Sequence, residues 1–234
     1  DVLPAGVSTN GAITATGGTL SGCPASGATS LAGCTVASGT NGPVVITVPV
    51  AVAANAANPT VNTATVTGGG DPTCTNCSGT TTNPVIDAVN DASTGQPGQA
   101  GTFNVSTNDK FPVGSTFTQT ATTCVPAGTM TGAVANFTYP GTTGASCTVT
   151  YSVCAPAPNT TICDTAVLTV TAGAAPALTV TKSATPVVLV VGGTGQVYTI
   201  TISVANGPTT AAINVSDVLP AGVSTNGAIT ATGG

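Results

Sequence analysis

The chain has 234 residues, and only 4% of them are charged, against roughly 25% in an average soluble domain. It contains two Lys, seven Asp and no His, Arg, Glu or Trp, and its net charge is −5. This composition excludes Ser/His/Asp and Cys/His catalysis and the common zinc sites that use His. Two Lys cannot neutralise a row of phosphates, so nucleic-acid binding is excluded as well. We expect a structural or binding protein, not an enzyme, with no cofactor.

The remaining composition predicts an all-β fold. Thr and Val, which are β-branched and suit strands, are abundant, and 30 Gly and 17 Pro supply turns. Strong helix formers other than Ala are scarce. No apolar run approaches the ~20 residues that a membrane helix needs, so we expect no membrane span.

Alternation of apolar and polar residues predicts short strands along the whole chain. In chain order these are 13–16, 44–52, 61–67, 101–106, 116–120, 133–139, 147–153, 165–170, 178–182, 197–204 and 212–218. Short strands at this spacing are typical of β-sandwiches. A Gly/Thr-rich stretch at 68–83 and the sequence AGAAPA at 172–177 separate the strands into three groups, which predicts boundaries near 82 and 171.

The two ends of the chain have the same sequence. Residues 1–18 and 217–234 both read DVLPAGVSTNGAITATGG, an offset of 217 − 1 = 216 residues. The simplest interpretation is a window cut from a tandem array with a 216-residue repeat. Residues 1–82 are then the C-terminal part of a sandwich A, 83–171 a sandwich B, and 172–234 a linker and the N-terminal part of the next sandwich A. A self-contained protein with a duplicated terminal segment is the alternative, and it is less favoured because the duplicated piece begins inside the predicted strand 212–218.

Eight cysteines fall into local pairs. The spacing pairs Cys23 with Cys34, Cys74 with Cys77 and Cys154 with Cys163, which leaves Cys124 with Cys147. Four structural disulfides indicate an oxidising compartment, and we expect an extracellular or cell-surface protein. A metal site at the single CxxC is the weaker alternative, because a second CxxC at zinc-ribbon spacing is missing.

Three polar residues share faces with apolar neighbours. Alternation places Lys182, Asp217 and Asn62 each on the apolar side of its predicted strand. Buried charges are costly unless they are paired, so Lys182 and Asp217 are expected to meet. They would then form a buried or half-buried ion pair with Asn62 as a hydrogen-bond partner; the alternative to this pairing is a Lys182 side chain that extends out to solvent.

Several short sequences carry a family resemblance. They are the first strand LTVTKSATP, the Asn-Gly-Pro turn, the DVLPAG turn and the last strand NTATV. Residues 176–234 and 1–77 resemble the conserved repeat domain (domain of unknown function eleven type) of giant bacterial surface and fibre proteins. Residues 83–171, with AVNDASTGQPG and NVSTNDKFP, are similar to bacterial cadherin-like or immunoglobulin-like repeats. The resemblance implies two immunoglobulin-like β-sandwich domains in each 216-residue tandem repeat.

The polar residues also resemble a known arrangement in surface-protein sandwiches. In those proteins a Lys on the first strand and an Asn on the last strand join spontaneously as an isopeptide amide, helped by an acid. The resemblance implies the same roles for Lys182, Asn62 and Asp217, with Asn62 supplied by the following copy of the repeat. Desolvation of Lys182 would leave its amine neutral and nucleophilic.

A calcium site is a weaker hypothesis. Asp87, Asp91 and Asp109 could hold calcium near a domain junction, although capping of turns by Asp91 and Asp109 is the favoured interpretation.

Together these features predict a structural repeat of an extracellular filament or cell-surface fibre, whose partner is a further copy of itself. The alternatives are the flexible stalk repeats of a large adhesin and a separate subunit that polymerises by strand donation.

Overall fold

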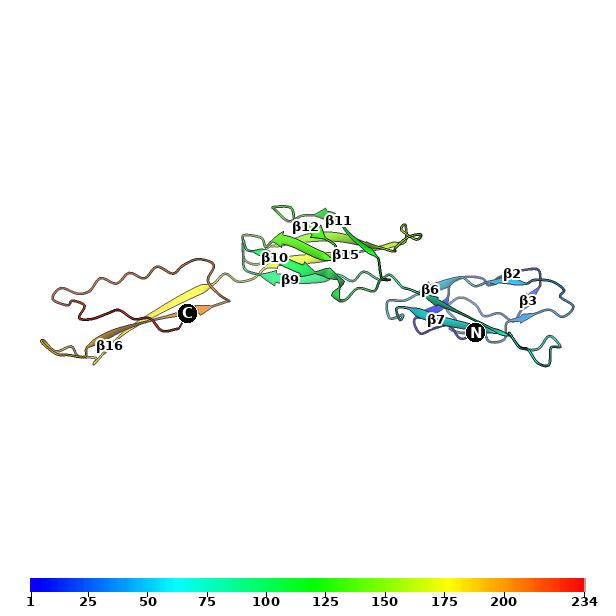
Figure 1. Cartoon of the computed structure of the whole chain (residues 1–234), viewed down its shortest axis with the longest axis horizontal. Helices are drawn as coiled ribbons and strands as arrows, with labels where there is room; N and C mark the ends of the chain where they lie inside the picture. Colours follow the sequence, from blue (N-terminus) through cyan, green and yellow to red (C-terminus); the bar gives the residue numbers. More distant parts are fainter. Residues whose placement is uncertain (234) are drawn as a thin grey trace. The chain divides into compact units, whose positions relative to one another are not determined.

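The structure, a computed structural model, describes residues 1–233 and consists of β-strands joined by turns (Figure 1). The all-β prediction is confirmed, since the helical residues among those described are the single 3₁₀ turn η1 (Val105–Thr107). No helix within 1–233 has the length and apolarity that a membrane crossing requires. The chain forms two compact units, Asp1–Gly173 and Ala174–Gly234.

The strands of the first unit are short in its first half and longer in its second half. They are β1 (Val7–Thr9), β2 (Thr14–Thr16), β3 (Leu20–Ser21), β4 (Thr35–Val36), β5 (Val45–Thr47), β6 (Val50–Val52), β7 (Thr60–Thr65), β8 (Ser78–Asn83), β9 (Asp91–Gly95), β10 (Ala100–Asn104), β11 (Thr116–Thr122), β12 (Thr129–Thr131), β13 (Val134–Thr138), β14 (Ser146–Cys154) and β15 (Cys163–Ala172). The second unit contains β16 (Ala177–Thr185) and β17 (Val197–Ala205).

Residues 84–173 form two sheets around one core. The larger sheet has the order β11-β14-β15-β9, in which β9 alone runs parallel to its neighbour, and the smaller sheet has the order β10-β13-β12 (Figure 1). Both sheets contribute to one cluster of buried side chains: Val105, Cys124, Ala135, Phe137, Cys147, Val149, Tyr151, Val153, Ala166, Leu168 and Val170. The alternation of β14 and β15 directs every second side chain inward, which explains why these strands are long and regular.

Tyr139 connects the two sheets of this domain. Its ring packs edge-on against Phe137, with centroids 5.2 Å apart, and its hydroxyl lies 2.8 Å from Ser93 Oγ in β9. Gly95 provides the necessary space, because a Cβ atom there would lie 2.3 Å from the Tyr139 ring. Packing of the Tyr139 ring therefore requires glycine at position 95 of this strand.

Residues 1–83 are arranged differently, as four two-stranded ladders: β1-β6, β2-β5, β3-β4 and β7-β8. The predicted strand 44–52 is divided in two, since Pro49 lacks the amide proton that a continuous ladder needs. Few side chains are buried here, and Ile46, Val50 and Val52 are each more than 40% exposed. The cluster of core residues named above lies wholly between 105 and 170.

The second unit is a single antiparallel hairpin, β16-β17, followed by residues without assigned strand. The prediction of a strand at 212–218 is therefore wrong for this structure. Residues 217–233 repeat the sequence of 1–17, but the strands that pair with β1 and β2 are β6 and β5, which belong to the first unit. A strand needs a neighbour for its backbone hydrogen bonds, so sequence preference alone does not form one.

Candidate functional site

The first half of the expected polar cluster is an ion pair between Lys182 and Asp217. Lys182 lies in β16, opposite Ile200 of β17. Its Nζ donates to both carboxylate oxygens of Asp217 at 2.7 Å and lies 4.5 Å from the centroid of the Tyr198 ring. The two side chains are 36% and 28% exposed, so the pair is half-buried. An ion pair this exposed contributes about 0–1 kcal/mol to stability.

The second half is a hydrogen bond between Asn62 and Asp1. Asn62 lies in β7, opposite Thr81, and its Nδ2 donates to Asp1 Oδ2 at 3.1 Å. The main chain of Asp1 is fixed, because its carbonyl oxygen accepts from Leu31 N at 2.8 Å and from Ser30 Oγ at 3.2 Å. Asp1 Oδ1 and Asn62 Oδ1 are buried and have no hydrogen-bond partner among the described residues.

These two halves are related by the repeated sequence. Asp1 and Asp217 occupy the same position of the 18-residue segment. The structure thus brings Lys182 to one copy of this aspartate and Asn62 to the other. The contact of Lys182 with Asn62, and the isopeptide amide between them, stay predictions.

The chemistry of the three groups is complementary. An ammonium group has three donors and no acceptor, whereas the free atoms of Asp1 and Asn62 are both acceptors. A lysine beside them would satisfy both. In the covalent alternative the neutral amine attacks Asn62 Cγ, the new amide forms, ammonia leaves, and the aspartate relays the proton.

The aspartates considered for calcium lie in two places. Asp91 and Asp109 converge on Tyr151, whose hydroxyl lies 3.0 Å from Asp91 Oδ2 and 3.2 Å from both carboxylate oxygens of Asp109. Asp87 instead pairs with Lys110, Oδ2 to Nζ at 3.6 Å. Over the described part of the chain, no three His, Cys, Asp or Glu side chains gather as a metal site.

Burial governs the electrostatics at Tyr151. It raises the pKa of both the Asp91 and Asp109 carboxyl groups, and the Tyr151 hydroxyl opposes this shift by hydrogen bonding to them. Burial, with the two carboxylates, also raises the pKa of Tyr151. The parallel pairing of β9 with β15, next to β14, brings Asp91 to Tyr151. Sequence reasoning did not find this contact because it depends on that long-range pairing.

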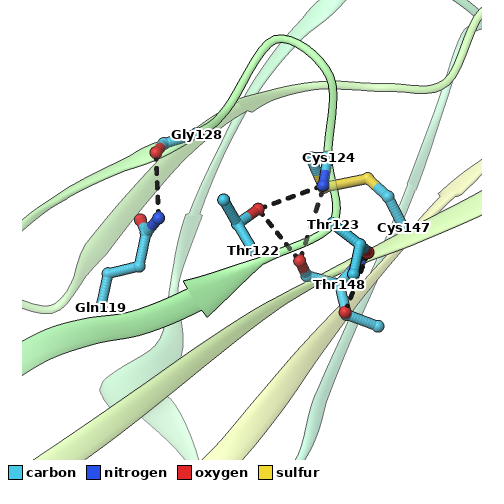
Figure 2. The surroundings of a disulfide bond; sticks show 7 residues. All are labelled: Gln119, Thr122, Thr123, Cys124, Gly128, Cys147 and Thr148. Atoms are coloured by element: carbon cyan, nitrogen blue, oxygen red, sulfur yellow. Dashed lines mark hydrogen bonds between the residues drawn. A yellow bond between two sulfur atoms is a disulfide. The ribbon is translucent and has the colours of Figure 1, made fainter.

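Four disulfides brace the first unit: Cys23–Cys34, Cys74–Cys77, Cys124–Cys147 and Cys154–Cys163. Figure 2 shows that Cys124–Cys147 joins the residues after β11 to the start of β14. Thr122 Oγ1 donates to Thr148 O at 3.1 Å and accepts from Cys124 N at the same distance. The disulfide and these hydrogen bonds hold the ends of two adjacent strands together.

A further contact, which residue patterns alone did not predict, joins residues 1–83 to residues 84–173 of the first unit. Lys110 Nζ donates to the carbonyl oxygens of Ala54 and Ala56. Asn58 Oδ1 accepts from Val85 N at 2.9 Å, and its Nδ2 donates to Phe111 O at 3.2 Å. The available signal was that Lys110 is one of only two lysines and is followed directly by the apolar residues 111–113.

No protein-family model matches the chain, and no curated protein or solved structure matches it significantly. The similarity to the conserved repeat domain of bacterial surface proteins therefore stays a prediction that depends on the short sequences quoted above.

Proposed function

We propose that the protein is a structural repeat of an extracellular filament or cell-surface fibre, and that it belongs to the tandem immunoglobulin-like repeats that it resembles. The observation that carries the proposal is the 18-residue identity at an offset of 216 residues. The same segment pairs with β5 and β6 at its first occurrence, whereas the described part of its second occurrence, residues 217–233, has no strand partner. This difference supports a periodic assembly in which one copy meets the next.

The composition supports a mechanical role. The disulfides belong to proteins of oxidising compartments, and each limits the freedom of the unfolded chain. With only nine charged residues, two Lys and seven Asp, neighbouring domains repel each other little. The residue types of general acid–base catalysis are nearly absent, so the proposed role is not enzymatic.

A chain of three tandem 216-residue repeats, produced in an oxidising compartment and examined by electron cryo-microscopy, tests this function. We expect particles with one fixed axial spacing per repeat. Repeats without a fixed spacing would support the flexible adhesin stalk instead.

Strand donation between separate subunits has its own test in native filaments. On a denaturing gel run under reducing conditions, a very large species indicates one continuous chain. A band of about one repeat indicates separate subunits joined by donated strands.

A further inference from the structure

Identical sequences occupy two environments in this protein. At the first occurrence Leu3, Val7 and Thr9 are buried, at 7%, 8% and 1% exposure. Thr9 Oγ1 donates to Ala25 O at 2.8 Å and accepts from Ala28 N at 2.9 Å. Over residues 217–233 of the second occurrence no strand forms, the equivalents Leu219 and Val223 are only half-buried, and Thr225 is exposed. The segment therefore adopts its paired conformation where strands β5 and β6 are present.

The hairpin β16-β17 is also incomplete by itself. Its register places Leu178 opposite Val204 and Val180 opposite Ile202, so that one face is apolar, with Lys182 among these residues. Leu178 and Val180 are 48% and 63% exposed. A two-stranded sheet with an uncovered apolar face is marginally stable in water, so this face requires a second layer.

The polar atoms indicate what covers it. Asp217 accepts from Lys182 on both oxygens. Its sequence equivalent Asp1, which accepts from Asn62, has one buried oxygen without a partner among residues 1–233, and so has Asn62. The missing group at the first site is a donor with several hydrogens, and the second site shows a lysine in contact with the same aspartate. The Lys182–Asp217 pair thus has the lysine that the Asp1–Asn62 pair lacks, and the Asp1–Asn62 pair has the asparagine that the Lys182–Asp217 pair lacks.

We propose that the hairpin β16-β17 and Asp217 of one copy pack on residues 1–83 of a second copy, so that Lys182 and Asn62 contact one shared aspartate. This inference rests on the proposed function and specifies the joint between repeats. In a continuous chain, Asp217 of one repeat is Asp1 of the next. Between separate chains, residues 217–233 of the donor replace residues 1–17 of the acceptor on β5 and β6.

The test uses the 234-residue chain and sedimentation velocity over a range of concentrations. We expect head-to-tail oligomers that lengthen with concentration. Lys182→Met disables the donor hairpin and Asn62→Leu disables the acceptor, and each lowers the association constant by on the order of tenfold or more, because a buried polar group loses its partner. The control Val113→Thr changes a fully exposed side chain of residues 84–173, outside the joint, and assembles as the unmodified chain does.

Mixing the two variants tests directly whether the hairpin of one copy binds residues 1–83 of another. Each retains the half that the other has lost, so an equimolar mixture forms dimers with one intact joint. Amide exchange protection in β14 and β15 shows that both variants keep the fold of residues 84–173.

The failures are distinguishable. Variants that assemble like the unmodified chain overturn this joint and leave the filament proposal standing, since another surface then makes the contact. An unmodified chain that stays monomeric also overturns the joint. If the three-repeat chain lacks a fixed spacing as well, the proposed function is overturned too.

Discussion

Lys110 donates a hydrogen bond from Nζ to the carbonyl oxygen of Ala56 at 2.9 Å, although 54 positions separate the two residues. The same ammonium group donates to Ala54 O and lies 3.6 Å from Asp87 Oδ2. Asn58 adds two hydrogen bonds nearby. One lysine and one asparagine therefore connect the ladders of residues 1–83 to the two-sheet domain that follows.

Replacing Lys110 with Met should loosen this connection. The carbonyl oxygens of Ala54 and Ala56 lose their donor, and we expect a loss of about 1–2 kcal/mol, the usual range for partly buried groups left without partners. Urea unfolding and amide exchange of residues 53–58 measure it. Val113→Thr, which changes a fully exposed side chain three positions away, is the control and should leave exchange at 53–58 unchanged.

Removing the disulfide Cys124–Cys147, by changing both residues to Ala, should destabilise residues 84–173. The bond closes a loop with a sequence separation of 23, and both cysteines are buried in the core cluster. Loop closure of this length predicts a loss of about 3 kcal/mol. Thermal unfolding measures it, and replacement of Cys74 and Cys77, whose separation is 3, should have a much smaller effect on this domain. Equal losses for the two pairs would contradict the argument.

The pair Asp91 and Asp109 predicts a dependence of stability on pH. Burial raises the pKa of both carboxyl groups above the ordinary value of 3.8, so the folded domain binds protons at a higher pH than the unfolded chain does. Stability should therefore rise as the pH falls from neutrality through the raised pKa values, and the gain should level off below 3.8. Thermal unfolding between pH 7 and pH 3.5 checks the sign.

Asp91→Asn is the matching substitution. It removes a buried charge near Asp109 and keeps an oxygen that can accept from Tyr151. We expect a higher melting temperature at pH 7 and a weaker pH dependence. A variant that is less stable at pH 7 would show that the ionised carboxylate is preferred at this position.

The isopeptide hypothesis has a direct readout in the three-repeat chain. Condensation of Lys182 with Asn62 of the next repeat releases one ammonia at each joint, and intact mass spectrometry under reducing conditions detects this loss. Asp217→Asn at the joint should prevent it, because the proton relay is removed. An unchanged mass rejects the cross-link and leaves the cluster as an ion pair with a hydrogen-bonded amide.

The fold was predictable where burial enforces a pattern. In β14 the residues Cys147, Val149, Tyr151 and Val153 point into the core, and their alternation is visible in the sequence. β8, with the sequence SGTTTN, and β9, with DASTG, carry no such signal, because their side chains are small and polar. The strand predicted at 212–218 failed for the opposite reason: its pattern is suitable, but no strand of the described residues pairs with it.

The polar cluster was only partly predictable. Alternation identified Lys182, Asp217 and Asn62, but it could not show that Asn62 contacts Asp1 in this chain. Asp91 begins β9 and Asp109 follows η1, and their association depends on the parallel position of β9, which no local pattern specifies. Long-range register, not residue type, was the missing information.

Both lysines of the chain are held by carboxylates, Lys110 by Asp87 and Lys182 by Asp217. Since Arg is absent, these two positions are all that trypsin-like proteases could cleave in the sequence. Cleavage requires an extended backbone around the lysine without hydrogen-bonded neighbours. Lys182, however, lies inside a paired strand, and the main chain of Lys110 forms hydrogen bonds with the main chain of Asp87. A fibre assembled from this sequence would therefore resist digestion by an entire class of secreted enzymes.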